Sequence, residues 1–198
     1  MAFRFDSATH SYWLDDQRVP AISTVLRAAQ SGGPWFTPEH RERGSAVHAA
    51  TLAFDLGAMT GVEALSSIRP EWQPYLRGYL DFRTAIAARW ARLEQPHVHR
   101  LLRFAGTPDR VGWIGGRPAI LEIKTGSFAD WHGMQTAAQD ILLHRKWGTI
   151  NRYVVYLLDT GEYKLRPNQD SGDYLRFIQA LAKMNVYSVI SDCDEGRD

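Results

Sequence analysis

The chain has 198 residues, with 23 basic and 22 acidic side chains and a formal net charge of +1. This length predicts one domain with a substantial core. The near-neutral charge argues against a protein that holds nucleic acid through phosphate contacts alone, unless bound cations supply part of the positive charge. The single cysteine, Cys193, excludes an internal disulfide framework and a site built from four cysteines.

The sequence shows no membrane or export signal. The N-terminal residues, from Met1 to Asp6, lack the apolar segment of a signal peptide. No run in the chain approaches the length that spans a membrane. We therefore expect a cytoplasmic protein with no membrane partner.

Residues 1–36 alternate aromatic and polar positions around turn signals, which predicts an N-terminal hairpin and a short helix. Thr37 and Pro38 suit the cap and first position of the next helix, which we expect to run to about Leu56. A short segment at 61–68 follows it.

A long helix is then expected from Pro70 to about Leu93, because aromatic residues recur there at helical spacing. Aromatics in this pattern favour a core role over base stacking. Glu94-Gln95-Pro96 breaks the helix, and residues 97–104 predict a strand.

The central feature is a predicted hairpin over residues 106–126, with Gly115-Gly116 as a tight turn that needs positive φ at both positions. Counting outward from that turn places Asp109 opposite Glu122, and the two carboxylates would meet at roughly 5 Å. Side chains alternate along a strand, so Lys124 shares the face of Glu122.

Two acids that face each other across a sheet repel. An acidic pair on a hairpin is most often an exposed surface feature. Here the strands are rich in aliphatic residues, so we expect a buried sheet, where unpaired charges are costly. A divalent cation between Asp109 and Glu122 would remove the repulsion.

The last third of the chain predicts, in order, a helix, two strands and a helix, over residues 128–146, 150–158, 162–165 and 170–187. On the first of these helices His132, Gln135 and Gln139 lie three and four residues apart and therefore share a face. Such a face is ordinarily solvated, and composition alone favours no other role.

Three features together resemble the PD-(D/E)xK nuclease superfamily, and within it the RecB-type exonuclease branch. Pro108-Asp109 is followed after twelve residues by Glu122-Ile123-Lys124. The helix before this pair carries Arg43-Gly44-Ser45-Ala46-Val47-His48, which matches the form Arg-Gly-x-x-x-His. The helix after it carries Gln135, although Gln139 stands where the branch has tyrosine.

The resemblance covers roughly Thr37 to Leu165 and implies an α/β fold with a mixed sheet, the restriction-endonuclease-like αβββαβ core with flanking helices. We therefore expect a single nuclease domain over residues 1–198. Its expected parts are an N-terminal hairpin and short helix, a catalytic core, a C-terminal helix and a frayed acidic tail, over residues 1–36, 37–165, 166–190 and 191–198.

The resemblance also implies metal-dependent hydrolysis of DNA phosphodiester bonds. Asp109, Glu122 and the carbonyl of Ile123 would hold one or two Mg²⁺ or Mn²⁺ ions, with His48 as an added ligand. Lys124 would orient the attacking water, help deprotonate it, or neutralise charge in the transition state.

Other residues would shape the site or touch nucleic acid. By resemblance, Gln135 contacts the backbone of the nucleic acid, with His132 and Arg43 as further contacts. The role of Gln139 is open because it replaces the tyrosine. Gly44 would allow its helix to approach the sheet closely.

Some members of the branch carry an iron–sulfur cluster, which one cysteine cannot hold. We expect single- or double-stranded DNA as the partner. By resemblance, we expect an exonuclease in DNA repair, recombination or phage DNA processing. If the protein is phage-encoded, we expect it in the host cytoplasm. Such domains act alone, as homo-oligomers or beside helicases. The alternatives are a DNA-binding module without catalysis, against which the intact acids and lysine argue, and a small-molecule phosphohydrolase.

Overall fold

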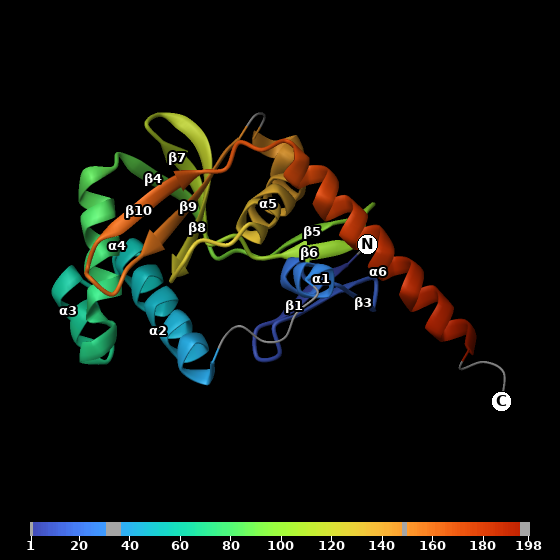
Figure 1. Cartoon of the computed structure of the whole chain (residues 1–198), viewed down its shortest axis with the longest axis horizontal. Helices are drawn as coiled ribbons and strands as arrows, with labels where there is room; N and C mark the ends of the chain where they lie inside the picture. The colour runs from blue at the N-terminus through green and yellow to red at the C-terminus, as the bar shows by residue number, and fades with distance from the viewer. Residues whose placement is uncertain (1, 31–36, 148–149, 195–198) are drawn as a thin grey trace.

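The computed structural model describes residues 2–30, 37–147 and 150–194 (Figure 1). Its helices are α1 (Ile22–Ala29), α2 (Pro38–Asp55), α3 (Gly61–Ser66), the 3₁₀ turn η1 (Pro70–Trp72), α4 (Gln73–Ala85), α5 (Trp131–Trp147) and α6 (Gly172–Asp194). Its strands are β1 (Phe3–Asp6), β2 (Ser11–Leu14), β3 (Gln17–Val19), β4 (Ala88–Leu93), β5 (His97–His99), β6 (Phe104–Gly106), β7 (Arg110–Ile114), β8 (Arg117–Thr125), β9 (Asn151–Leu157) and β10 (Tyr163–Pro167).

A five-stranded mixed sheet forms the centre of the molecule, in the order β10-β9-β8-β7-β4. Strands β8 and β9 are parallel and are joined through α5, whereas the other neighbouring pairs are antiparallel. The chain order α2, β4, β7, β8, α5, β9 is the αβββαβ order expected from the sequence. The predicted α/β fold with a mixed sheet and flanking helices is confirmed.

Helices cover both faces of this sheet (Figure 1). On one face α2 and α4 pack against Leu121, Ile123 and Val155, all fully buried. On the other face α5 lies over β8 and β9, with α1 and α6 packed behind it. Burial on both faces explains the nearly continuous apolar run of β9.

The central hairpin forms as predicted. Gly115 and Gly116 have φ values of 57° and 76°, and Ile114 pairs with Arg117 across them. Such values suit a type I′ turn, whose twist matches that of the flanking strands. This register places Lys124 two residues beyond Glu122, on the same face of β8.

The helix predicted to run from Pro70 to Leu93 is wrong in its second half. Helix α4 ends at Ala85, and residues 88–93 form β4, an edge strand that pairs with β7. Exposed and less exposed residues alternate along β4, with the two-residue period of a strand. The helical spacing of the aromatic residues upstream hid the change from helix to strand. Residues 97–104 are also not the first strand of the core, since β5 and β6 form a separate two-stranded sheet.

The two ends of the chain flank this core. Strands β1, β2 and β3 form an antiparallel N-terminal meander in place of a simple hairpin. Helix α6 continues to Asp194, past residue 191 where a frayed tail was expected, and residues 195–198 lie outside the described part. No helix among the described residues is long and apolar enough to cross a membrane.

Glycine matters for packing at Gly112 and not at Gly44. A Cβ on Gly112 would lie 2.0 Å from the carbonyl oxygen of Arg89 in β4. A Cβ on Gly44 would meet Thr125 Oγ1 at 3.8 Å, an ordinary contact. The expectation that Gly44 is needed for close approach of helix and sheet is therefore wrong.

We predict opposite effects of alanine at these two positions. Gly112→Ala forces the backbone of β4 away from β7 and should lower the free energy of unfolding by about 2–3 kcal/mol. Gly44→Ala removes backbone entropy from the unfolded chain and should raise it by about 0.5–1 kcal/mol. Urea unfolding of both variants measures the difference, and equal stabilities would contradict the packing described.

Candidate active site

Asp109 and Glu122 meet where β7 begins. The pairing of β7 with β8 ends with Arg110 opposite Leu121, and each acid lies one residue beyond that pair. Asp109 precedes β7 directly, and its Oδ2 accepts a hydrogen bond of 2.7 Å from the amide of Ile123. Both acids are buried, with 7% and 3% of their surface exposed. The carboxylate pair predicted from the hairpin therefore lies inside the protein.

His48 reaches this pair from α2. Its Nε2 lies 3.1 Å from the carbonyl oxygen of Ile123, which can only accept, so this nitrogen carries the proton. In the neutral ring the other nitrogen, Nδ1, then has a free lone pair. It lies 3.5 Å from Asp109 Oδ1, which is also an acceptor. Two electron-rich atoms at this separation suit a shared cation.

Three donors hold the Glu122 carboxylate. Lys124 Nζ and Gln135 Nε2 lie 2.7 Å and 2.6 Å from Oε1, and Gln139 Nε2 lies 2.6 Å from Oε2. Burial raises the pKa of Glu122, and the negative charge of Asp109 raises it further, whereas Lys124 and Gln139 act in the opposite direction. The donors therefore offset only part of the cost of this buried charge.

The polar face of α5 is not solvated. Gln139 is 2% exposed, and both Gln135 and Gln139 point at Glu122. Their Oε1 atoms are buried and make no hydrogen bond to a described residue. Unpaired buried oxygens next to two acids suit ordered water or a hydrated cation. Gln139, whose role the sequence left open, thus bonds to Glu122.

The predicted metal ligands do not form a ready-made cluster. Within the described ranges no three His, Cys, Asp or Glu side chains gather closely enough to hold an ion. Glu122 is turned toward its three donors, and the carbonyl of Ile123 is already bonded to His48. The pair formed by His48 Nδ1 and Asp109 Oδ1 still fits a divalent cation, since Mg²⁺ and Mn²⁺ favour carboxylate oxygen and Mn²⁺ also accepts imidazole.

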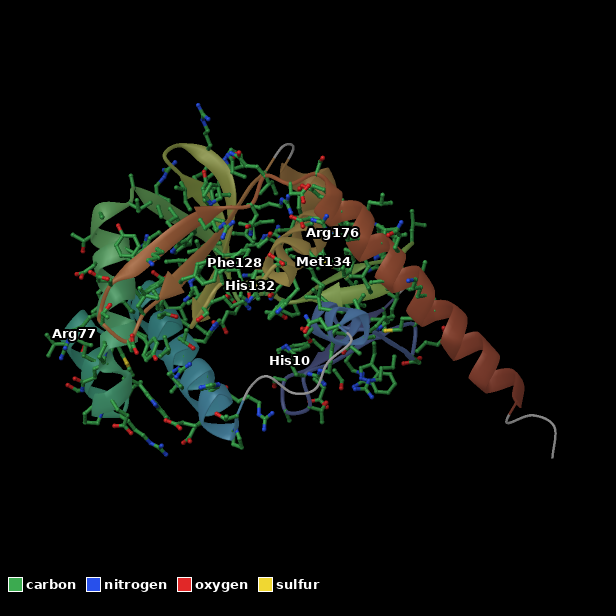
Figure 2. The ribbon with its side chains drawn as sticks, in the orientation of Figure 1. His10, Arg77, Phe128, His132, Met134 and Arg176 are labelled. Atoms are coloured by element: carbon green, nitrogen blue, oxygen red, sulfur yellow. The ribbon has the colours of Figure 1, made fainter. Side chains whose placement is uncertain are left out.

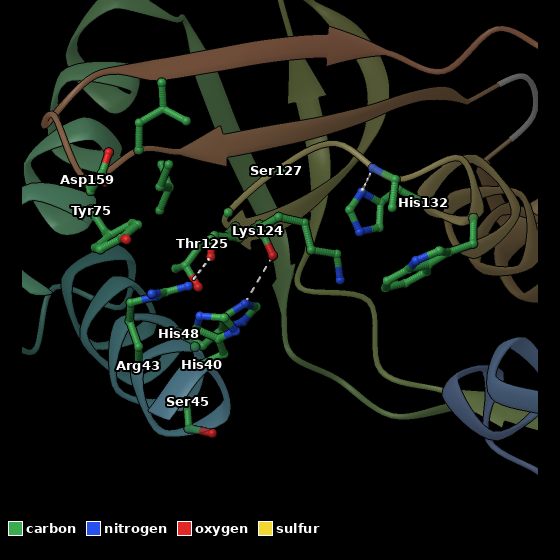
Figure 3. Close-up of a pocket in the computed structure, with 17 residues that line it drawn as sticks. His40, Arg43, Ser45, His48, Tyr75, Lys124, Thr125, Ser127, His132 and Asp159 are labelled. Atoms are coloured by element: carbon green, nitrogen blue, oxygen red, sulfur yellow. Dashed lines mark hydrogen bonds between the residues drawn. The ribbon is translucent and has the colours of Figure 1, made fainter. Parts of the chain in front are cut away.

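A cleft of about 860 Å³ opens beside His48 (Figure 3). Arg43 and His48 enter it from α2, and Lys124 and His132 from the opposite side. Arg43 is held by Thr125, whose carbonyl oxygen accepts from Nη2 at 2.8 Å. The cleft thus presents the guanidinium of Arg43 and the ammonium of Lys124, which pairs with Glu122, together with one acid, Asp159.

His132 lines the same cleft but is buried and neutral. Its Nδ1 lies 2.9 Å from the hydroxyl of Tyr156, and only 3% of the residue is exposed. Burial, and then the charge of Lys124, lowers the pKa of His132 to about 3. A neutral ring offers no charge to a phosphate, so His132 shapes the wall of the cleft.

A smaller cavity of about 220 Å³ lies behind the acids. His48, Asp109 and Glu122 line it together with both glutamines of α5. Glu94 also reaches it, although it lies 3.4 Å from Arg110 and is only partly buried. The opposite wall comes from the N-terminal meander and α1, which the sequence did not connect with the site.

Sequence reasoning also missed a buried ion-pair network beneath the site. Arg110 follows Asp109 directly, and its fully buried Nε lies 2.7 Å from Asp55 Oδ2 on α2. Tyr79 and Arg83 of α4 bond to the same carboxylate. This network joins α2, α4 and β7, and so fixes the helix that carries His48 against the strand that follows Asp109.

Arg110 makes further contacts that leave little of its guanidinium unsatisfied. Its Nη1 donates to the Asp109 carbonyl at 2.9 Å, and its Nη2 donates to Thr51 Oγ1 at 3.1 Å. Neighbouring negative charge and burial act in opposite directions, and the pKa of Arg110 rises above its ordinary value. An arginine within an apolar strand could have signalled this network, but nothing in the sequence identified Asp55 as its partner.

Known proteins resemble this chain only distantly. No family model matches the chain, and no curated protein matches it in sequence. Among solved structures it is similar to an alkaline exonuclease, LHK-Exo, from Laribacter hongkongensis, with 14% identity and a TM-score of 0.38 over 89% of this chain and 93% of that one. A likeness this distant carries no argument about activity, so what the site can do follows from its own residues.

We predict that Arg110→Met destabilises the protein strongly. The variant leaves Asp55 buried with one fewer cation, which should lower the free energy of unfolding by about 3 kcal/mol or more. Arg69→Met is the matched control, because the Arg69–Glu42 pair is more than half exposed. Its loss should cost at most about 1 kcal/mol. Similar costs for both variants in chemical denaturation would contradict the network.

Proposed function

We propose that the chain is a metal-dependent nuclease of the PD-(D/E)xK superfamily, RecB-type, that hydrolyses DNA phosphodiester bonds. The observation that carries this proposal is that two buried carboxylates, Asp109 and Glu122, line one cavity together with His48. Lys124 lies 2.7 Å from Glu122 Oε1. In a hairpin with only a structural role, burial of two neighbouring carboxylates would cost free energy without any gain.

The electrostatics of the acids support a bound cation. Burial and the charge of Asp109 both disfavour ionised Glu122, and Lys124 supplies only one positive charge for two acids. A divalent ion near Asp109 would balance the pair. When bound, such an ion polarises a phosphoryl oxygen and lowers the pKa of a coordinated water.

The residues of the chain would then have separate roles in hydrolysis. Asp109 Oδ1 and His48 Nδ1 would hold the ion, with Glu122 joining when its carboxylate turns from the donors of α5. Lys124, at the edge of the cleft, would face the phosphate and offset its developing charge. The ammonium of Lys124 also lies 5.3 Å from the ring centre of Trp131, which restrains its position.

The cleft provides a path for the strand that enters the site. Arg43 and Lys124 supply local positive charge in a protein of net charge +1, and the metal would supply the rest. A duplex or single strand with an anionic backbone fits this arrangement. A DNA-binding module without catalysis would need the charges but not the buried acids.

We predict that Asp109→Asn and Glu122→Gln each lower the rate of DNA hydrolysis at least a thousandfold, because each removes a charge that holds the metal. The measurement is digestion of labelled linear and circular DNA with Mn²⁺, Mg²⁺ or EDTA. Asp81→Asn is the control, since Asp81 is an exposed acid on α4. Full activity in both site variants, or in EDTA, would contradict the proposal.

We also predict that Mn²⁺ raises the melting temperature of the wild type at neutral pH and leaves that of Asp109→Asn unchanged.

The pKa of Glu122 predicts how stability changes with pH. Because burial raises this pKa in the folded protein, the contribution of Glu122 to stability is complete below its ordinary pKa near 4.5. That contribution is lost as pH rises through the higher pKa of the folded state. In EDTA the wild type should therefore lose stability over that rise, and Glu122→Gln should lose less. Thermal scans with and without Mn²⁺ across this pH range test both statements.

A further inference from the structure

The face of the sheet that carries Lys124 continues beyond the cleft onto the edge strand β10. Lys124 of β8 pairs with Tyr156 of β9, and Tyr156 pairs with Lys164 of β10. Paired residues on neighbouring strands point to the same face of a sheet, so these three side chains form one row across it. Neighbouring strands lie about 4.8 Å apart, which puts the backbone of β10 about 10 Å from that of β8.

The part of this face that lies on β10 is exposed and carries two cations. A second row leads from Glu122 across β9 to Arg166, two residues after Lys164. Both basic residues are exposed, whereas Tyr163 and Leu165, which alternate with them, pack against the core on the opposite face. Within the part of the chain that the structure describes, neither cation forms an ion pair.

An exposed aromatic ring lies over Arg166. Phe128, in the loop between β8 and α5, is 46% exposed, and the guanidinium carbon of Arg166 lies 3.9 Å from its ring centre. The same ring meets those of His132 and Tyr156 edge-on, with 6.5 Å and 6.2 Å between the ring centres (Figure 2). His132 and Tyr156 are buried, so they support the ring from the interior. We call Phe128, Lys164 and Arg166 together the rim surface.

The rim surface adjoins the cleft. Ser127 and Ala129, the neighbours of Phe128 in the chain, line the cleft, and so does Lys124, at the start of the first row. Lys124, Ser127 and His132 lie along one side of the cleft in Figure 3. A strand that lies in the cleft can therefore continue over this loop onto β10.

One acid shares the exposed face of β10. Glu162 lies two residues before Lys164, on the side away from Arg166, and its carboxylate accepts from the hydroxyl of Thr160 at 3.3 Å. The cationic end of this face is therefore the end that Phe128 covers.

An exposed aromatic ring beside cations is typical of surfaces that bind single-stranded nucleic acid. A base stacks on the ring, and the cations contact the phosphates on either side of it. The plane of an arginine guanidinium also stacks on bases. In a duplex the bases stack on one another and leave no face free, so such a ring adds little to duplex binding.

We propose that the rim surface binds an unpaired stretch of the DNA strand that runs through the cleft. A base stacks against Phe128, and Lys164 and Arg166 contact neighbouring phosphates. The proposal rests on the proposed nuclease function and adds a preference for single-stranded over duplex DNA. The surface binds DNA away from the buried acids and takes no part in the hydrolysis itself.

The test separates stacking from charge. Phe128→Leu keeps an apolar side chain and removes the ring, and Arg166→Gln and Lys164→Gln each remove one charge. Lys183→Gln, which changes an exposed lysine on α6, is the matched control. Fluorescence anisotropy in EDTA measures binding of labelled oligothymidylate, and of a duplex of the same length, over a range of salt concentrations.

We expect the wild type to bind the single strand more tightly than the duplex. Phe128→Leu should weaken single-strand binding about fivefold or more and leave its salt dependence unchanged, because stacking involves no counterion release. Arg166→Gln and Lys164→Gln should each weaken binding and reduce the slope of log K against log salt by about 0.7, the value for one phosphate contact on a single strand. Lys183→Gln should match the wild type, and all four variants should keep its melting temperature.

Three results would overturn the proposal: a wild type that binds no single strand, Phe128→Leu with the affinity of the wild type, or equal losses by Phe128→Leu on single strand and duplex. Losses in the two charge variants alone would indicate a surface for any polyanion and would also overturn it. Because binding is measured in EDTA, it is independent of hydrolysis. If no DNA is cleaved with Mn²⁺, the proposed nuclease function fails, and single-strand binding that depends on Phe128 still supports the rim surface.

Discussion

The hydrogen bond from the Ile123 amide to the Asp109 carboxylate is the interaction on which the site depends. It fastens an acid that lies outside the regular pairing of β7 onto β8, the strand that carries Glu122 and Lys124. The same residue, Ile123, accepts from His48 through its carbonyl. One residue of a buried strand therefore positions both an acid and an imidazole. Because that strand is rigid, the two side chains keep a fixed geometry.

The buried network around Arg110 supports this segment from below. A buried ion pair often contributes little net stability, but breaking it leaves an uncompensated charge, so it favours one arrangement of its partners. Here the partners are α2, α4 and β7, the elements that set His48 against Asp109. Above the site, two neutral amides and one ammonium hold Glu122. Two acids and the single ammonium of Lys124 leave the charge at the site partly unbalanced.

The surroundings of the acids differ from one side to the other. On the side of the cleft lie two basic side chains, Arg43 and Lys124, and one acid, Asp159. On the other side, the two acids and Glu94 line the smaller cavity, and no lysine or arginine does. The basic side chains around the acids therefore lie on the side of the cleft.

The sequence by itself determined the features that local geometry fixes. Two glycines set the turn, alternation set the faces, and together they gave the register that places Asp109 beside Glu122 and Lys124 on the face of Glu122. The start of α2 at Thr37 followed from capping in the same way. Only the tertiary structure decided the strand β4, the contact of Gln139 with Glu122, the pairing of Arg110 with Asp55 and the cavity wall that the N-terminal meander and α1 supply. Each of these joins residues far apart in the chain, and their partners are selected by packing between elements, which no local pattern encodes.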